Sequence, residues 1–229
     1  MKYDKILFDL DNTIIDFDDT EKTALEKASK EFNVSFSKKL LSRYHEINDN
    51  LWKQLEKGEV DRKNLIYLRF KKLFDEFNIL GIEQLEFNTA YMKNIAFGKK
   101  LIKNASETVK KCSNLGAKCY IITNGSLQVQ YKRLDGQPFM DYISGVAISE
   151  EVGAAKPSKD FFTNAEKRFN VMFDSKTLIV GDSLTSDILG GVNAGIDTCY
   201  VNRKNLVNNS TIKPTYEISD IKDLIDIII

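Results

Sequence analysis

The chain has 229 residues, of which 42% are hydrophobic and 29% charged, as in a globular protein of one large domain or a domain with an insertion. Lys+Arg and Asp+Glu both number 33, so the formal net charge is zero and nothing favours a nucleic-acid polymer as partner. Three cysteines, none in a Cys-x-x-Cys pair, and one histidine argue against a disulfide framework or a structural zinc site. No signal peptide or membrane-length apolar run is recognisable, so we expect a cytoplasmic protein with no membrane partner.

The predicted elements begin with a short apolar strand at residues 5–10. From residue 20 to about residue 101 the pattern is helical, without proline, and apolar residues such as Ala24, Leu25 and Ala28 recur at helical spacing. After residue 101 the pattern alternates. Strands are predicted at residues 117–125, 143–149, 176–183 and 197–202, helices at 159–170 and 187–196, and a closing helix or strand at 219–229.

Apolar strands that alternate with helices are typical of a parallel sheet buried on both faces. We therefore predict an α/β protein with a Rossmann-like core, residues 1–16 and 100–229, and an α-helical cap domain, residues 17–99, inserted after the first strand. Ligands of such sheets bind beyond the carboxyl ends of the strands. An insertion at the end of the first strand is therefore expected to act as a lid.

Four polar clusters fall at predicted strand ends. They are Asp9 with Asp11, Thr123-Asn124-Gly125, Lys156-Pro157, and Gly181-Asp182-Ser183 with Asp187. Each cluster alone also fits an ordinary polar turn. Because the ends of parallel strands meet at one edge of the sheet, the four clusters should converge, and their order along the chain favours chemistry over turns.

The combination of side chains suits phosphoryl transfer. Several carboxylates in one place repel one another and favour a hard cation such as Mg²⁺. Thr123, Asn124 and Lys156 can donate hydrogen bonds to a phosphate. One carboxylate can attack phosphorus and form an aspartyl-phosphate. A second carboxylic acid two residues further on points the same way in extended backbone and can protonate the leaving oxygen.

The sequence resembles the haloacid-dehalogenase-like hydrolases in four motifs, which occur in that family's order: "DLDNT" (9–13), "ITNG" (122–125), "AAKP" (154–157) and "VGDSLTSD" (180–187). The resemblance implies that Asp9 is the nucleophile and Asp11 the general acid and base. It also implies Mg²⁺ ligands and phosphate-binding groups. The implied metal ligands are Asp9, the backbone carbonyl of Asp11, and Asp182; the implied phosphoryl ligands are Thr123, Asn124 and Lys156, with Asp187 and Ser183 in support.

A closer resemblance is to the bacterial pyrimidine 5′-nucleotidases of the house-cleaning type. The stretches that carry it are "INDNLWKQLEKGEV" (47–60), "NGSLQVQYKRL" (124–134), "ISEEVGAAKP" (148–157) and residues 180–202. The resemblance implies a phosphoric monoester hydrolase acting on a small phosphate ester, a nucleoside 5′-monophosphate, with Mg²⁺ or Mn²⁺. Related phosphatases carry a Pro-Gly pair where the chain returns to the core, whereas "FGKKLIKNASE" (97–107) contains no proline. We expect a monomer or weak dimer.

Alternatives remain open at this point. The same site chemistry fits a sugar-phosphate or broad-range phosphatase or a phosphomutase. It also fits a non-enzymatic phospho-receiver module, although such modules need no lid and have no use for Asp11 as an acid. Asp11 argues against the dehalogenase branch of the family, which lacks this acid and does not use Mg²⁺. Trp52 could stack on a nucleobase, but apolar neighbours such as Leu51 favour a place in the cap core.

Overall fold

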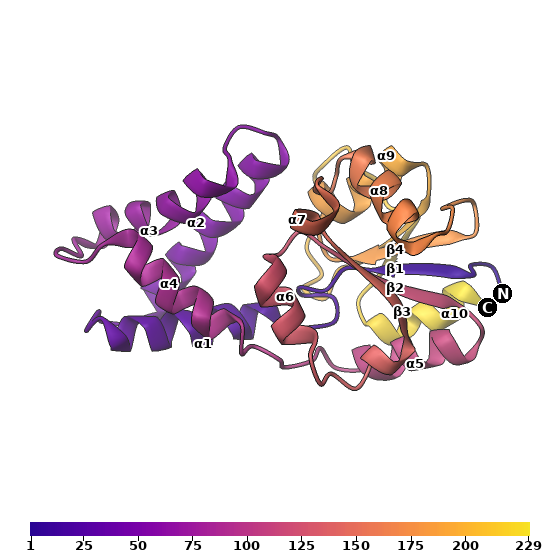
Figure 1. Ribbon diagram of the computed structural model, residues 1–229, viewed down its shortest axis with the longest axis horizontal. Helices are drawn as coiled ribbons and strands as arrows, with labels where there is room; N and C mark the ends of the chain where they lie inside the picture. Colours follow the sequence, from indigo (N-terminus) through magenta and orange to yellow (C-terminus); the bar gives the residue numbers. More distant parts are fainter. The chain divides into compact units, whose positions relative to one another are not determined.

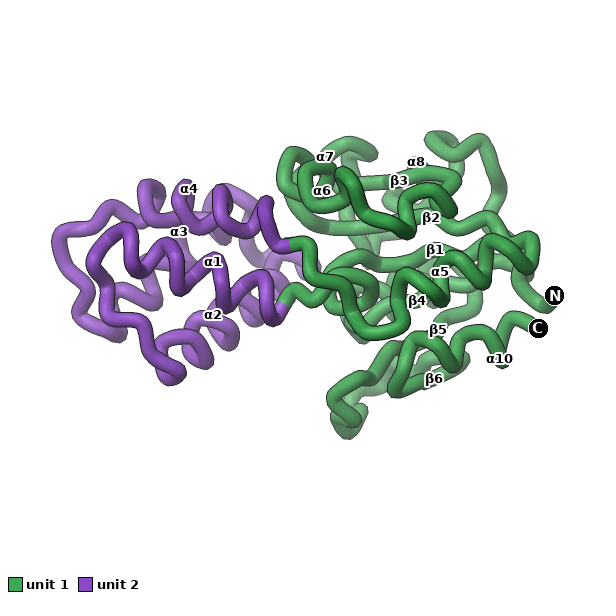
Figure 2. The backbone as a smooth tube through the Cα atoms, turned by 90° about the horizontal axis from the view of Figure 1, so that it is seen from below, with its two compact units in different colours: residues 1–17, 99–229 green, residues 18–98 purple.

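The structure is a computed structural model that describes all residues, 1–229. The chain divides into two compact units (Figure 2). Unit 1 consists of Met1–Phe17 and Lys99–Ile229, and unit 2 of Asp18–Gly98. The first boundary lies inside the first turn of helix α1 (Phe17–Glu31), so the chain passes between the units there without a loop.

Unit 1 contains a six-stranded parallel sheet in the order β3-β2-β1-β4-β5-β6. Its strands are β1 (Lys5–Phe8), β2 (Lys118–Thr123), β3 (Ile143–Ile148), β4 (Thr177–Gly181), β5 (Asp197–Val201) and β6 (Tyr216–Ile218). Strand β1 lies between β2 and β4, and Phe8 is in register with Ile121 and Val180. The predicted parallel α/β fold is confirmed. Strand β6 was not predicted, because three residues are too few to show an alternating pattern.

Helices cover both faces of this sheet. They are α5 (Ala105–Asn114), α6 (Leu127–Leu134), α7 (Ser149–Val152), α8 (Lys159–Phe169), α9 (Leu189–Ala194) and α10 (Leu224–Ile228). Two 3₁₀ turns, Met140–Tyr142 and Ile221–Asp223, and one π-helical turn, Leu184–Ile188, complete the unit. Figure 1 shows α5 and α10 on one face and α8 and α9 on the other. The closing segment is helical.

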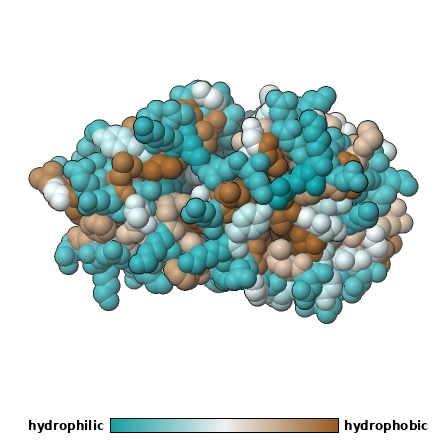
Figure 3. Space-filling model, in the orientation of Figure 1, coloured by the Kyte–Doolittle hydropathy of each residue, from teal (hydrophilic) through white to brown (hydrophobic).

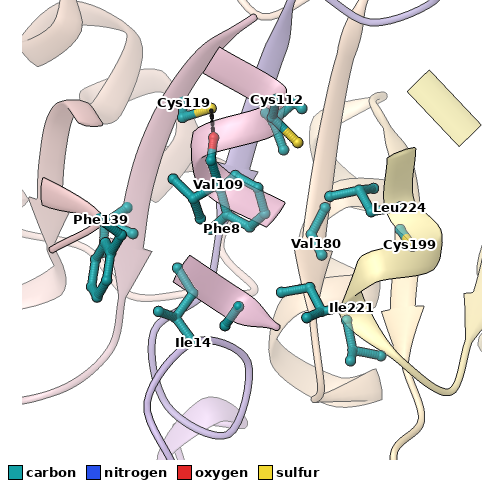
Figure 4. Packing of buried hydrophobic residues seen from close by; sticks show 14 of the residues in the cluster. Phe8, Ile14, Val109, Cys112, Cys119, Phe139, Val180, Cys199, Ile221 and Leu224 are labelled. Atoms are coloured by element: carbon teal, nitrogen blue, oxygen red, sulfur yellow. Dashed lines mark hydrogen bonds between the residues drawn. The ribbon is translucent and has the colours of Figure 1, made fainter. Parts of the chain in front are cut away.

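Alternate residues of β1 enter two separate hydrophobic clusters. Ile6 and Phe8 belong to the cluster that α5 and α10 complete, where Figure 4 shows Phe8 with Cys112 and Cys119. Leu7 belongs to the opposite cluster, which α8 completes with Phe161 and other apolar residues. A strand buried on both faces therefore reads as a continuous apolar run, and the run ends where the polar site begins.

The segments that leave and re-enter unit 1 pair with each other. The amide of Ile102 donates to the carbonyl of Ile14, and the amide of Asp16 donates to that of Lys100, both at 2.8 Å. Ile14 is fully buried. The return to apolar residues after Asp11 thus anchors the point where the chain departs for unit 2.

Unit 2 consists of four helices: α1, α2 (Lys38–Glu56), α3 (Arg62–Phe77) and α4 (Gln84–Ile95). Ser37 and Asp61 cap α2 and α3 by accepting hydrogen bonds from the amides of Leu40 and Asn64. The interior is aromatic and includes Tyr44, Phe70, Phe74, Phe87 and Tyr91. No helix of the chain combines the length and the apolar character needed to cross a bilayer. On the face seen in Figure 3, hydrophilic residues predominate, with hydrophobic ones in scattered patches.

Candidate active site

The order of the strands brings three of the predicted site residues to one edge of the sheet. Asp9 directly follows β1, Thr123 ends β2, and Asp182 directly follows β4. The amide of Asp9 donates to the carbonyl of Val180 at 2.9 Å, so Asp9 continues the pairing of β1 with β4. The position of Asp9 is therefore fixed by the sheet and not by a loop.

Lys156 lies at the centre of a buried charge cluster. Its Nζ donates to Oδ1 of Asp9 (2.6 Å), to Oδ1 of Asp187 (2.7 Å) and to the carbonyl of Ile122 (3.1 Å). These bonds use all three donors of the ammonium, which is 1% exposed. Burial acts to lower the pKa of Lys156, but the charges of Asp187 and Asp9 outweigh it and raise the pKa. The lysine is therefore a fixed cation beside Asp9.

Asn124 holds the backbone that carries this lysine. Its Nδ2 donates to the carbonyl of Lys156 (2.8 Å), and its Oδ1 accepts from the amide of the same residue (2.9 Å). The paired bonds join the end of β2 to the Lys156-Pro157 segment. Asn124 therefore acts on the site through Lys156.

The other carboxylate beside Lys156 depends on a close approach to a glycine. Oδ2 of Asp187 accepts a hydrogen bond from the amide of Ser183 at 3.1 Å, within the π-helical turn. A Cβ atom at Gly181 would lie 2.2 Å from that same oxygen. Only glycine leaves room for Asp187 there, which explains the Gly-Asp-Ser sequence at the end of β4. Ser183 also caps the turn, because its Oγ accepts from the amide of Ser186 at 3.1 Å.

The donor set fits a divalent cation. Carboxylate oxygens of Asp9, Asp182 and Asp187 lie within 4.8 Å of one another, and one lysine opposes three potential negative charges. Burial raises the pKa of Asp9 to about 8 despite the opposing charge of Lys156. Burial, followed by the charges of Asp9 and Asp187, also raises the pKa of Asp182 well above its ordinary value. A hard oxygen-binding ion such as Mg²⁺ would stabilise the charged forms of these carboxylates.

Asp11 lies in a separate set of contacts that the sequence did not predict. Oδ1 of Asp11 accepts from Nη1 of Arg133 (2.5 Å), and Oδ2 accepts from Nε2 of Gln130 (2.7 Å). The same Nε2 donates to Oγ1 of Thr123 at 2.8 Å. Gln130 and Arg133 are both 1% exposed and lie on α6. The available signal was their spacing of three residues, which places both on one face of a helix directly after the Thr-Asn-Gly turn.

Trp52 lies in unit 2, on α2. The guanidinium of Arg62 lies over its ring, 5.4 Å from the ring centroid. The ring is only partly buried, so it is not part of the closed aromatic interior of the unit.

A parallel α/β sheet with clustered carboxylates and a buried lysine at the carboxyl ends of its strands is the architecture of an enzyme that handles phosphate esters. The chain belongs to the haloacid dehalogenase-like hydrolase family, whose sequence profile matches residues 6–201. The predicted family and the predicted enzyme class, a phosphoric monoester hydrolase, are confirmed, and the phospho-receiver alternative is set aside.

The similarity to individual proteins extends over the whole chain. The pyrimidine 5′-nucleotidase PynA of Streptococcus pneumoniae is 35% identical, over 99% of this chain and 95% of its own. The pyrimidine 5′-nucleotidase YjjG of Escherichia coli is 33% identical, over 98% and 97%. The crystal structure of YfnB from Bacillus subtilis, bound to magnesium, matches with a TM-score of 0.93 at 33% identity, covering 100% of this chain and 99% of that one.

Proposed function

We propose that the protein hydrolyses nucleoside 5′-monophosphates, preferably those of pyrimidines, with Mg²⁺ and through an aspartyl-phosphate on Asp9. The observation that carries the chemistry is the ion pair of Asp9 with the buried Lys156 in the carboxylate cluster. The full-length similarity to two pyrimidine 5′-nucleotidases supports the substrate class.

Asp9 is suited to act as the nucleophile. Lys156 holds its Oδ1, so Oδ2 is the oxygen available to attack phosphorus. Asp9, Asp182 and the backbone carbonyl of Asp11 are the proposed Mg²⁺ ligands, and Asp187 lies within reach of the same place. The bound ion would neutralise the carboxylates and the phosphoryl oxygens, which otherwise repel each other. The structure of YfnB is bound to magnesium, which supports Mg²⁺ as the ion.

The remaining residues divide the other tasks. Thr123 donates a hydrogen bond to a phosphoryl oxygen. Lys156, whose three donors are used within the protein, attracts the phosphoryl group through its positive charge, and Asn124 keeps the Lys156 segment in place. Asp11 gives a proton to the departing 5′-oxygen and later takes one from the water that hydrolyses the aspartyl-phosphate. Positioning and charge neutralisation supply most of the acceleration in such reactions.

Residues 17–99 are the proposed cap domain, with Trp52 as the proposed base-stacking residue. The structure of YfnB is described as revealing interdomain movement, which supports a mobile cap in this proposal. The buried free thiols of Cys112, Cys119 and Cys199 fit the proposed location in the reducing cytoplasm.

The test is a phosphate-release assay with Mg²⁺ or Mn²⁺ over nucleoside monophosphates and sugar phosphates. We expect the fastest release from UMP, dUMP or TMP, and none from these with Asp9→Asn. A strong preference for sugar phosphates would contradict the nucleotidase proposal and favour a sugar-phosphate or broad-range phosphatase. Near-wild-type turnover by Asp9→Asn would contradict the aspartyl-phosphate mechanism.

A further inference from the structure

Helix α6 buries two polar side chains, although it is only eight residues long. Gln130 and Arg133 are each 1% exposed, while Gln128 on the same helix is exposed. Burying an amide and a guanidinium is costly unless hydrogen bonds replace the lost water. The partners of these two side chains are the predicted acid and the predicted phosphate-binding threonine. A use connected with the site therefore accounts for their burial.

The amide of Gln130 has one possible orientation. Nε2 donates to Oδ2 of Asp11 and to Oγ1 of Thr123, and Oε1 accepts from Nη1 of Arg133 at 2.8 Å. Exchanging the nitrogen and the oxygen would place an amide oxygen against a carboxylate and an amide N–H₂ against a guanidinium. Arg133 and Asp11 thus fix the direction of the amide from opposite sides.

The fixed amide determines what the Thr123 hydroxyl can do. Oγ1 of Thr123 accepts from Nε2 of Gln130 (2.8 Å) and from the amide of Gly125 (3.1 Å). A hydroxyl has two lone pairs and one proton, so both of its acceptor positions are used. The proton of Thr123 remains as the donor. A phosphoryl oxygen, which only accepts, is the complementary partner.

The same pair of residues orients Asp11. Each oxygen of this carboxylate accepts one bond, from Arg133 and from Gln130, so rotation of the group about its Cβ–Cγ bond is restricted. The side chain of Asp11 is nevertheless 28% exposed, which leaves it accessible to a substrate. The guanidinium of Arg133 in turn lies over the ring of Phe17, 5.6 Å from its centroid.

The Thr-Asn-Gly turn leaves space for Gln130. A Cβ atom at Gly125 would lie 2.0 Å from Nε2 and 2.4 Å from Cδ of Gln130. A side chain at position 125 would therefore displace the glutamine. The position of Gln130 therefore depends on the absence of a side chain at Gly125.

We propose that Gln130 and Arg133 are positioning residues of the phosphatase: Gln130 keeps Thr123 as a hydrogen-bond donor to the phosphoryl group, and both hold Asp11 in the orientation for proton transfer. This inference rests on the proposed function. It goes beyond it by assigning the orientation of two proposed site residues to one face of α6.

The test compares two substrates with different leaving groups. UMP releases a ribose alkoxide that needs a proton, whereas p-nitrophenyl phosphate releases a stable phenolate that does not. Arg133→Met is expected to lower the ratio of kcat/KM for UMP to that for p-nitrophenyl phosphate by about 10-fold. Gln130→Met, of similar shape but without donors, should lower this ratio too. It should also lower kcat/KM for p-nitrophenyl phosphate by about 10²-fold, because Thr123 loses its fixed orientation.

Matched controls are available on the same helix. Gln128→Met makes the identical change at an exposed position, and Lys132→Met removes an exposed positive charge beside Arg133. Both should keep the wild-type ratio. Arg133→Lys keeps one nitrogen that can donate to both Asp11 and Gln130, so it should restore part of the ratio lost in Arg133→Met.

The ratio of two substrates does not depend on how much of the enzyme is folded. It therefore remains valid for a destabilised variant, and each of the two methionine variants provides a second test if the other does not fold. A wild-type ratio in whichever of Gln130→Met and Arg133→Met folds would show that the two side chains only fill space, and it would overturn the proposal. If the wild-type protein releases no phosphate from UMP, the proposed substrate fails. The best alkyl phosphate then replaces UMP in the same test.

Discussion

Asp9 and Asp11 are two residues apart, but different parts of the molecule hold them. Asp9 is 7% exposed and continues the central strand β1. It pairs with Lys156, which comes after β3, the strand that lies beyond β2 in the sheet. The side chain of Asp11 is 28% exposed and is held by α6 through Gln130 and Arg133. The place of the first carboxylate follows from the sheet topology, and that of the second from one short helix.

The charge balance differs in the same way. Around Asp9, one lysine faces three carboxylates, and the pKa of Asp9 and of Asp182 is raised. Asp11 has a counter-ion of its own in Arg133. The first environment therefore fits an added cation, whereas the second has its counter-ion within the protein. Variants of the two carboxylates and of their cationic partners test this difference between the Asp9 and Asp11 environments.

The largest expected effect separates the two carboxylates by substrate. Asp9→Asn should lower kcat on both UMP and p-nitrophenyl phosphate by about 10⁴-fold, because the covalent step requires the carboxylate. Asp11→Asn should lower kcat/KM for UMP by about 10²-fold and that for p-nitrophenyl phosphate much less, because kcat/KM reports the step that forms the aspartyl-phosphate and only UMP needs a proton in that step. Asp141→Asn, at an exposed position, is the control. Equal losses on both substrates for Asp11→Asn would remove the distinction between nucleophile and acid.

The second prediction concerns stability. Lys156→Met should lower the free energy of unfolding of the metal-free protein by about 3–5 kcal/mol, because it leaves Asp9 and Asp187 buried without their cation. Urea unfolding followed by circular dichroism measures the loss. Lys167→Met, at an exposed position of α8, should change the free energy by less than about 0.5 kcal/mol.

Arg133→Met offers the comparison on the side of Asp11. Arg133→Met should lower the free energy of unfolding by less than Lys156→Met does. The carboxylate that loses its partner is then Asp11, which is partly exposed, so water can solvate it. A larger loss for Arg133→Met than for Lys156→Met would reverse the proposed difference between the two environments.

The Asp9 environment could be predicted from the sequence for a physical reason. Apolar runs that end at Asp9, Thr123 and Asp182 identify buried strands, and parallel strands must converge at their carboxyl ends. A pattern of this kind needs no knowledge of individual contacts. The six-stranded sheet was predictable on the same grounds, apart from the three-residue β6.

The Asp11 environment could not be predicted in the same way. Gln130 and Arg133 look like the exposed face of a polar helix, and their partner Asp11 is 119 and 122 residues away in the sequence. Their burial follows from tertiary packing, which one sequence does not encode as a periodicity. The close approach of Asp187 to Gly181 is a similar case, since the sequence shows a glycine but not what fills the space beside it.

A smaller effect is expected in the pH dependence of metal binding. The pKa of Asp9 is raised to about 8, above its ordinary value near 4, so between these values the folded metal-free protein keeps a proton that the unfolded chain has lost. Stability of the metal-free protein should therefore fall as pH rises through this window. Mg²⁺ displaces the proton, so its affinity should rise up to about 10-fold per pH unit for each proton released.

Thermal unfolding with and without Mg²⁺ at several pH values measures both trends. The stabilisation by Mg²⁺ should be larger at pH 8 than at pH 6, and Asp9→Asn should flatten the dependence. Asp11→Asn should leave most of the pH dependence of the Mg²⁺ stabilisation unchanged, because Asp11 has Arg133 as counter-ion. A metal-free protein that becomes more stable as pH rises through this window would contradict the raised pKa.

The smallest expected effect tests whether the Asp9 environment depends on the π-helical turn. Ser183 caps that turn, and Ser158 caps α8 in the same way by accepting from the amide of Asp160 at 3.2 Å. Each Ser→Ala change should cost about 1 kcal/mol of unfolding free energy. Only Ser183→Ala should also lower kcat, by a few-fold, because that turn carries Asp187 and so helps to hold Lys156. Equal kinetics in the two variants would show that Gly181 and Lys156 keep Asp187 in place without the cap.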